Sequence, residues 1–153
     1  MNSNWLKTLT ELFEGIRIIQ QSKKETLLKF EQFCEFVAEP AFESLVEALG
    51  EYKVKAKIKK KKEKCIILQI NFEQSRVEQF EYILELPQNS VEFKLSLTTR
   101  GRRTKKGRKE EESQPFLIQA GEEDLLKISK EDIIIDVINH YRDHVYDSLT
   151  SNK

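Results

Sequence analysis

The chain has few residues of the kinds that cross-link a fold or anchor it in a membrane. Its two cysteines, Cys34 and Cys65, lie in unrelated apolar stretches. Such lone thiols are typical of small buried hydrophobes and favour a reducing compartment. The longest uncharged apolar run, residues 65–72, is too short to span a bilayer, and the first residues do not resemble a secretion signal. We therefore expect a soluble, cytoplasmic protein with no membrane contact.

Signatures of catalysis are missing as well. None of the five glycines belongs to a phosphate-cradling pattern, which argues against a nucleotide-binding loop or a dinucleotide fingerprint. No serine, threonine or cysteine stands in a recognisable nucleophile turn. We predict that the chain is not an enzyme and holds no cofactor.

The chain has only two histidines, but their spacing raises the question of a metal site. The only two, His140 and His144, are four residues apart, as in some helical metal sites. With about 100° per residue, an apolar helix face centred on Ile134 leaves both rings on the water side. Three aspartates share that side, and no other histidine or cysteine is near to complete a site. We predict a solvated helix face without metal; the aspartates are Asp136, Asp143 and Asp147.

Positive charge, by contrast, is concentrated in two short segments. Residues 53–64 contain eight lysines and one glutamate, and residues 100–109 contain seven cations and no acid. The rest of the chain has eleven cations against twenty-five acids, so a formally neutral molecule is strongly polarised. Both segments are candidate contacts for an anion such as nucleic acid. The candidate contact residues are Arg100, Arg102, Arg103, Lys105, Lys106, Arg108, Lys109, Lys53, Lys55 and Lys57.

Each basic segment also has a simpler interpretation. The arginines of residues 100–109 can grip phosphate bidentately, but no aromatic residue lies among them and three glutamates follow as counterions. Lysines on one face of an edge strand are a common means of preventing edge-to-edge aggregation. In an up-and-down sheet the first and fourth strands lie three spacings, roughly 14 Å, apart. One continuous basic groove would therefore require a strongly curled sheet.

Helical periodicity dominates the first fifty residues. Apolar residues recur at helical spacing over residues 5–19, and the polar residues 20–24 separate them from a second helical pattern over residues 24–37. Pro40 is suited to a first helical turn and predicts a short third helix ending at Gly50. We interpret residues 1–22 as a detachable N-terminal amphipathic helix that a second copy could share in a homodimer. The residues of its apolar face are Trp5, Leu9, Leu12, Phe13 and Ile16.

After Gly50 the period changes to two, which predicts strands. We expect them at residues 53–59, 64–72, 77–86, 91–97 and 115–119, with a long polar loop over residues 100–114. Ser129 and Asp132 resemble a capping box that begins a last helix. The predicted fold is α+β: residues 23–153 form one domain with helices in 24–49, an antiparallel meander of about five strands in 52–119, and a helix over 130–149 packed on the sheet.

Three functions are compatible with this fold. The one we favour is a non-catalytic binding or adaptor protein that acts through protein–protein contacts. The first alternative is a nucleic-acid or other polyanion-binding protein that uses residues 53–64 and 100–109. The second is a small-ligand binder with a cavity between a curled sheet and the C-terminal helix. The aromatic residues that would line such a cavity are Phe80, Tyr82 and Phe93, which we expect to belong to the core instead.

Overall fold

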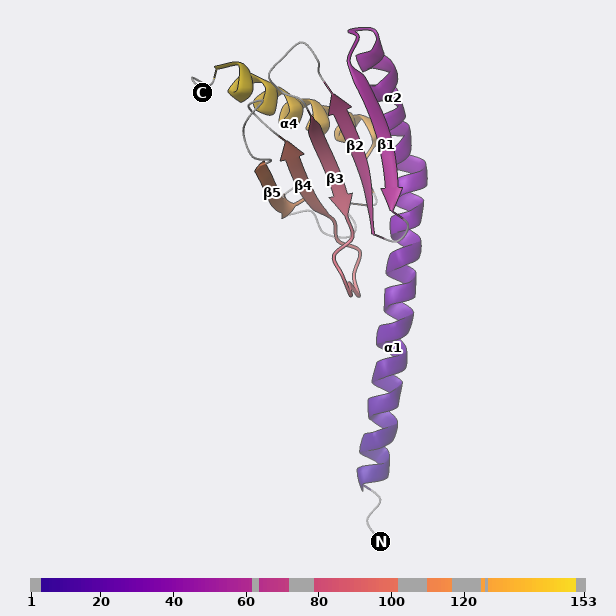
Figure 1. Ribbon diagram of the computed structural model, residues 1–153. Coiled ribbons are helices and arrows are strands. Elements are labelled where there is room, and N and C mark those ends of the chain that lie inside the picture. The colour runs from indigo at the N-terminus through magenta and orange to yellow at the C-terminus, as the bar shows by residue number, and fades with distance from the viewer. Residues whose placement is uncertain are drawn as a thin grey trace.

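The protein is an α+β fold in which a five-stranded antiparallel sheet carries helices on one face (Figure 1). The computed structural model describes residues 4–61, 64–71, 79–101, 110–116, 125 and 127–150. The sheet order is the predicted meander, β1 to β5 in sequence. The elements are α1 (Asn4–Phe33), η1 (Cys34–Ala38), α2 (Glu39–Gly50), β1 (Lys55–Lys61), β2 (Cys65–Asn71), β3 (Phe80–Glu85), β4 (Ser96–Gly101), β5 (Glu110–Pro115) and α4 (Lys130–Thr150).

The first three helical segments follow one another without a break. The predicted separation at residues 20–24 is wrong, because α1 runs through it from Asn4 to Phe33. Pro40 stands at the start of a helix that ends at Gly50, as predicted, although no break separates this helix from the helical segments before it. Pro40 lies in the first turn of α2, directly after the π-helical segment η1, where the Glu39 N–H donates to the Cys34 carbonyl. The wider π turn accommodates a residue that has no N–H to donate, so the chain remains helical.

Two strands differ from the prediction. Residues 91–95 alternate in polarity but form no strand, and β4 begins only at Ser96. Residues 110–114, predicted as loop, form β5 together with Pro115, and β5 pairs with β4 from Ser96 opposite Pro115 to Gly101 opposite Glu110. Backbone groups carry this pairing, so a run of polar side chains can still complete the sheet. Residues 117–119 of the predicted fifth strand lie outside the described part of the chain.

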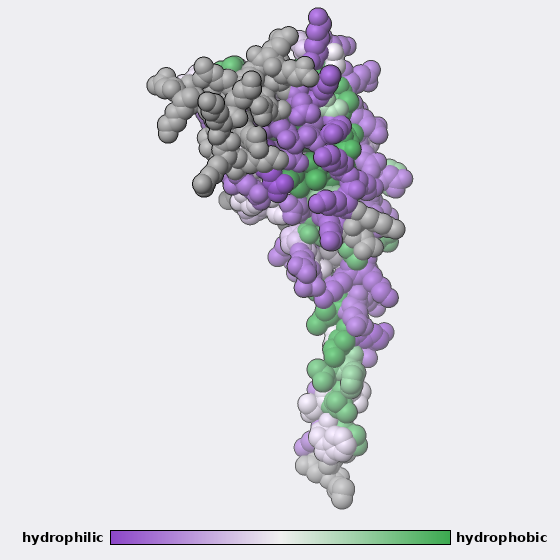
Figure 2. All heavy atoms as spheres, in the orientation of Figure 1, coloured by the Kyte–Doolittle hydropathy of each residue, from purple (hydrophilic) through white to green (hydrophobic). Residues whose placement is uncertain are grey.

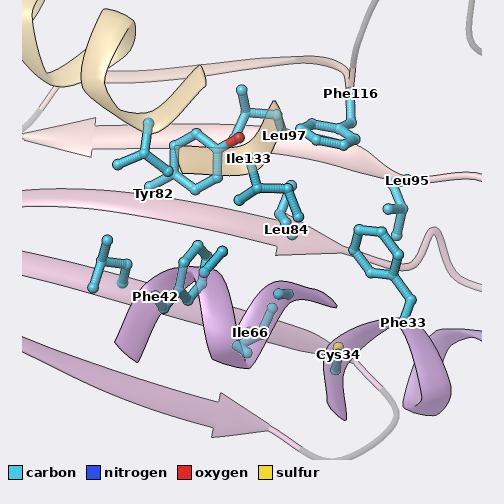
Figure 3. Close-up of a cluster of buried hydrophobic side chains, with 14 of the residues drawn as sticks. Phe33, Cys34, Phe42, Ile66, Tyr82, Leu84, Leu95, Leu97, Phe116 and Ile133 are labelled. Carbon is cyan, nitrogen blue, oxygen red and sulfur yellow. The ribbon is translucent and has the colours of Figure 1, made fainter. Parts of the chain in front are cut away.

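The core fills the space between the sheet and the helices (Figure 3). Alternate residues of β2, β3 and β4 point toward α2 and α4, and Phe42 of α2 meets Tyr82 of β3 edge to face with ring centroids 5.9 Å apart. Phe33, at the end of α1, packs in the same way on Phe93. The prediction that Phe80, Tyr82 and Phe93 are core residues is confirmed, because all three are buried.

Helix α4 begins as predicted but exposes a different face. The Ser129 N–H donates to the Asp132 carboxylate, and the Asp132 N–H donates to the Ser129 hydroxyl, which confirms the capping box. The buried residues are Ile133, Val137 and His144, whereas Ile134, on which we centred the buried face, is only partly buried and Ile138 is about half exposed. The three consecutive isoleucines 133–135 make the face ambiguous from sequence alone.

Candidate binding surfaces

Strand β1 is an edge strand with an exposed row of lysines. Lys55 and Lys57 are exposed, as predicted, while Ala56 and Ile58 are partly buried on the opposite face. Lys53 is also exposed but precedes the strand, in a turn where its φ is 62°. Because β1 is at the edge of the sheet, its lysines can also serve to prevent edge-to-edge pairing with another chain.

Arg100 lies on the same face as Lys57, but acids surround it. Residues directly opposite one another in an antiparallel sheet share a face. The pairing places Lys57, Gln69, Glu81, Arg100 and Glu111 in one row across the five strands. The Arg100 guanidinium donates from Nε to Glu111 Oε2 at 3.1 Å. Within the described residues Arg100 is therefore partly neutralised; Arg102, Arg103, Lys105, Lys106, Arg108 and Lys109 lie outside those residues.

A groove of about 620 Å³ opens on the sheet face away from α4. Its apolar wall includes Ile67 and Ile83, which with Cys65 form a small cluster separate from the main core. Burial raises the pKa of the Cys65 thiol, and the nearby Glu85 carboxylate raises it further. Sequence reasoning missed this groove, because strand register brings its walls together. The cations on its lining are Lys23, Lys61, Lys64 and Arg100.

The prediction that both histidine rings face water is wrong. His144 is only 8% exposed and packs on Phe80, with ring centroids 5.1 Å apart. A Cβ at Gly101 would lie 2.6 Å from a ring carbon of His144, so glycine is the residue that leaves room for the ring. His140 lies partly buried beside Tyr82, with its Nε2 3.6 Å from an oxygen of Asp136. Among the described residues, no group of three or more metal-binding side chains forms.

The N-terminal part of α1 exposes an apolar stripe. Residues 4–19, which we call the projecting segment, extend beyond the sheet, and Figure 2 shows apolar residues gathered along this rod. Trp5 is 66% exposed and Phe13 61% exposed. The five residues predicted for this face are all exposed. Leu6 and Ile19 belong to the same surface; the full set, called the stripe below, is Trp5, Leu6, Leu9, Leu12, Phe13, Ile16 and Ile19.

Comparison with known proteins adds no relative. No protein-family model, curated protein or solved structure matches the chain. None of the helices in the described ranges combines the length and the apolar character needed to cross a bilayer.

Proposed function

We propose that the chain is a non-catalytic binding or adaptor protein that contacts another protein through the stripe on the projecting segment. The observation that carries this proposal is the exposure of seven large apolar side chains along one helix face, beyond the reach of the packed sheet. A continuous apolar surface of this kind on a soluble chain marks an interaction site. A lone helix of about sixteen residues is also only marginally stable in water, so docking would stabilise it.

The chemistry of the thiols supports a binding role in the cytoplasm. Both cysteines are free and buried. Burial raises the pKa of Cys34 to about 12, which keeps the thiol protonated and unreactive at neutral pH. A pair of reduced, inert cysteines fits a protein that works in a reducing compartment without thiol chemistry.

Site-specific photo-crosslinking in the producing cell tests the proposal. A photoreactive residue at Leu12 lies in the stripe, and the same residue at Glu14 lies on the opposite helix face and is similarly exposed. We expect a discrete protein adduct from position 12 and none from position 14. Equal yields at the two positions, or no adduct at position 12, would refute protein contact through the stripe.

A second candidate function is binding of a polyanion, favoured by the cations that line the groove. Lys61 ends β1 and Lys64 directly precedes β2, and the lysine row of β1 continues from Lys61 along the sheet edge. Binding to mixed RNA and DNA across a salt series tests this candidate. Affinity that falls steeply with salt supports it, with a slope of roughly 0.7 to 0.9 per phosphate contact, whereas no binding at low salt rejects it.

A further inference from the structure

The stripe belongs to a repeat that runs the whole length of α1. Residues 5, 9, 12, 16, 19, 23, 26, 30 and 33 follow one another at alternating intervals of four and three. This mean spacing of 3.5 residues is the heptad repeat of helices that pair by coiling around each other. The last three positions, Thr26, Phe30 and Phe33, are buried within the chain itself. The first five have the same pattern and are exposed, without cover from the part of the chain that the structure describes.

Charge is excluded from the edges of this repeat. In residues 4–22 the positions that flank the repeat are Leu6, Thr8, Phe13, Gly15, Gln20 and Ser22, and none is charged. The charged residues of this segment all lie on the far side of the helix; they are Lys7, Glu11, Glu14 and Arg17. A second identical surface could therefore pack on the stripe without placing like charges opposite each other.

The continuity of α1 decides the direction of such a pairing. In a parallel pair, the partner helix would follow the repeat past residue 23 and enter the space where the chain's own core encloses Phe30 and Phe33. Because α1 is one unbroken helix over Asn4–Phe33 in each copy, neither helix of a parallel pair can bend away from the other before it reaches that space. In an antiparallel pair, the N-terminal end of the partner helix lies beside residue 23, so the partner helix stops before the buried part of α1. We propose that the partner of the stripe is a second copy of this chain, paired antiparallel over residues 5–23; this inference rests on the proposed function.

The antiparallel arrangement fixes which residues meet. The heptad repeat has two alternating core positions, and in an antiparallel pair each kind packs against the other kind in the partner helix. This rule places Leu9 against Ile19 of the partner subunit and Leu12 against Ile16 of the partner subunit. The two copies of Gly15 then face each other beside the symmetry axis. A Cβ at Gly15 would meet no atom within 4 Å in the single chain. The glycine is thus not required by the chain's own packing, and it leaves room for a second helix to approach closely.

The surface is large enough for a stable contact. Seven apolar side chains that are each about half exposed offer roughly 700 Å² per copy, close to the roughly 800 Å² per partner of standard protein interfaces. The same register brings Trp5 of the partner subunit over Lys23, whose amine donates to the Asn89 side chain at the mouth of the groove. Trp5 is the only tryptophan, so its fluorescence reports this contact directly.

Disulfide trapping between two variants that each carry one added cysteine tests the direction and register. Leu12→Cys chains and Ile16→Cys chains, carrying tags of different mass, are mixed and oxidised beside the wild type, whose buried cysteines provide the background. We expect the mixed 12-to-16 disulfide to dominate. A dominant 12-to-12 disulfide would indicate a parallel pair and overturn the proposal.

Sedimentation velocity of the full chain over a concentration series provides the second measurement. We expect a dimer whose formation shifts Trp5 emission to the blue. Leu12→Glu should weaken association by roughly a hundredfold or more, because it buries a charge in an apolar seam. Gly15→Leu should also weaken it while the single chain stays folded. A dimer indifferent to both variants, or a strict monomer at all concentrations, refutes self-pairing. If position 12 still photo-crosslinks to a protein of another mass, self-pairing has failed and the adaptor role stands.

Discussion

The two halves of α1 share one pattern and have opposite surroundings. Between residues 26 and 33 the repeat is buried, with Phe30 only 2% exposed, and between residues 5 and 19 it is open to solvent. Hydrophobic periodicity therefore indicates where a helix requires cover and says nothing about which surface provides it. In the second half the cover is the chain's own core, and in the first half no described residue buries the repeat.

The largest expected difference between the halves is seen with two matched phenylalanine truncations. Phe30→Ala should lower the free energy of unfolding by about 3 to 5 kcal/mol, because it removes a fully buried ring. Phe13→Ala should change the stability of the single chain by less than about 0.5 kcal/mol and should weaken association instead. Urea unfolding at a concentration below that of association measures both. Equal losses would mean that the projecting segment is packed in the isolated chain.

A pair of glycines provides a second, smaller contrast. Gly101→Ala should destabilise the fold by about 1 to 3 kcal/mol, because the added Cβ would lie 2.6 Å from His144 and 2.9 Å from the Gln79 carbonyl oxygen. Gly15→Ala should stabilise α1 by up to about 1 kcal/mol, since the helix gains a better former and meets no atom. Thermal unfolding of the two variants in parallel, at a concentration below that of association, checks the opposite signs. A loss of stability from Gly15→Ala would contradict the open surroundings of that position.

The smallest expected effect is a loss of folding stability at high pH, which arises in the packed part of the molecule. Burial raises the pKa of Tyr141 from 10.0 to about 12. An acid whose pKa is raised by folding loses its proton more easily in the unfolded chain, so its contribution is complete below pH 10 and is lost as the pH rises toward 12. As the pH rises, the free energy of unfolding of Tyr141→Phe should fall by about 1 to 2 kcal/mol less than that of the wild type, a figure reduced for the partial exposure of the ring. Unfolding followed at pH 9 and pH 11 tests this, and identical losses in the variant and the wild type would reject it.

Local signals predicted most of the fold. The change of period after Gly50 located the sheet, and the Ser129 cap located the start of α4. The errors arise where a local rule was overridden by tertiary structure. Pro40 breaks an α-helix but is tolerated after a π turn, and Phe93 is buried without belonging to a strand. The polar β5 is held by its backbone pairing with β4.

The candidate surfaces were predictable only in part. Exposure of the lysines of β1 and of the N-terminal apolar face follows from periodicity, because each pattern lies within one element. The neutralisation of Arg100 by Glu111 and the burial of His144 against Gly101 depend on strand register and on the rotation of α4. Such contacts join residues far apart in the chain, and composition does not encode their distances.

The π turn before Pro40 also gives the molecule a mechanical property. At about 1.5 Å per residue, Trp5 lies roughly 45 Å along the helix from this turn. The helix between them is a rigid arm, so a tilt of about 5° at the π turn would carry the tip sideways by roughly 4 Å, close to one residue's length of chain. A π turn is a place where a helix can change its winding at low cost. A force applied at Trp5 therefore acts first on Phe30 and Phe33, which hold the helix in the core, and reaches η1 through them, where Cys34 and Ala38 are fully enclosed.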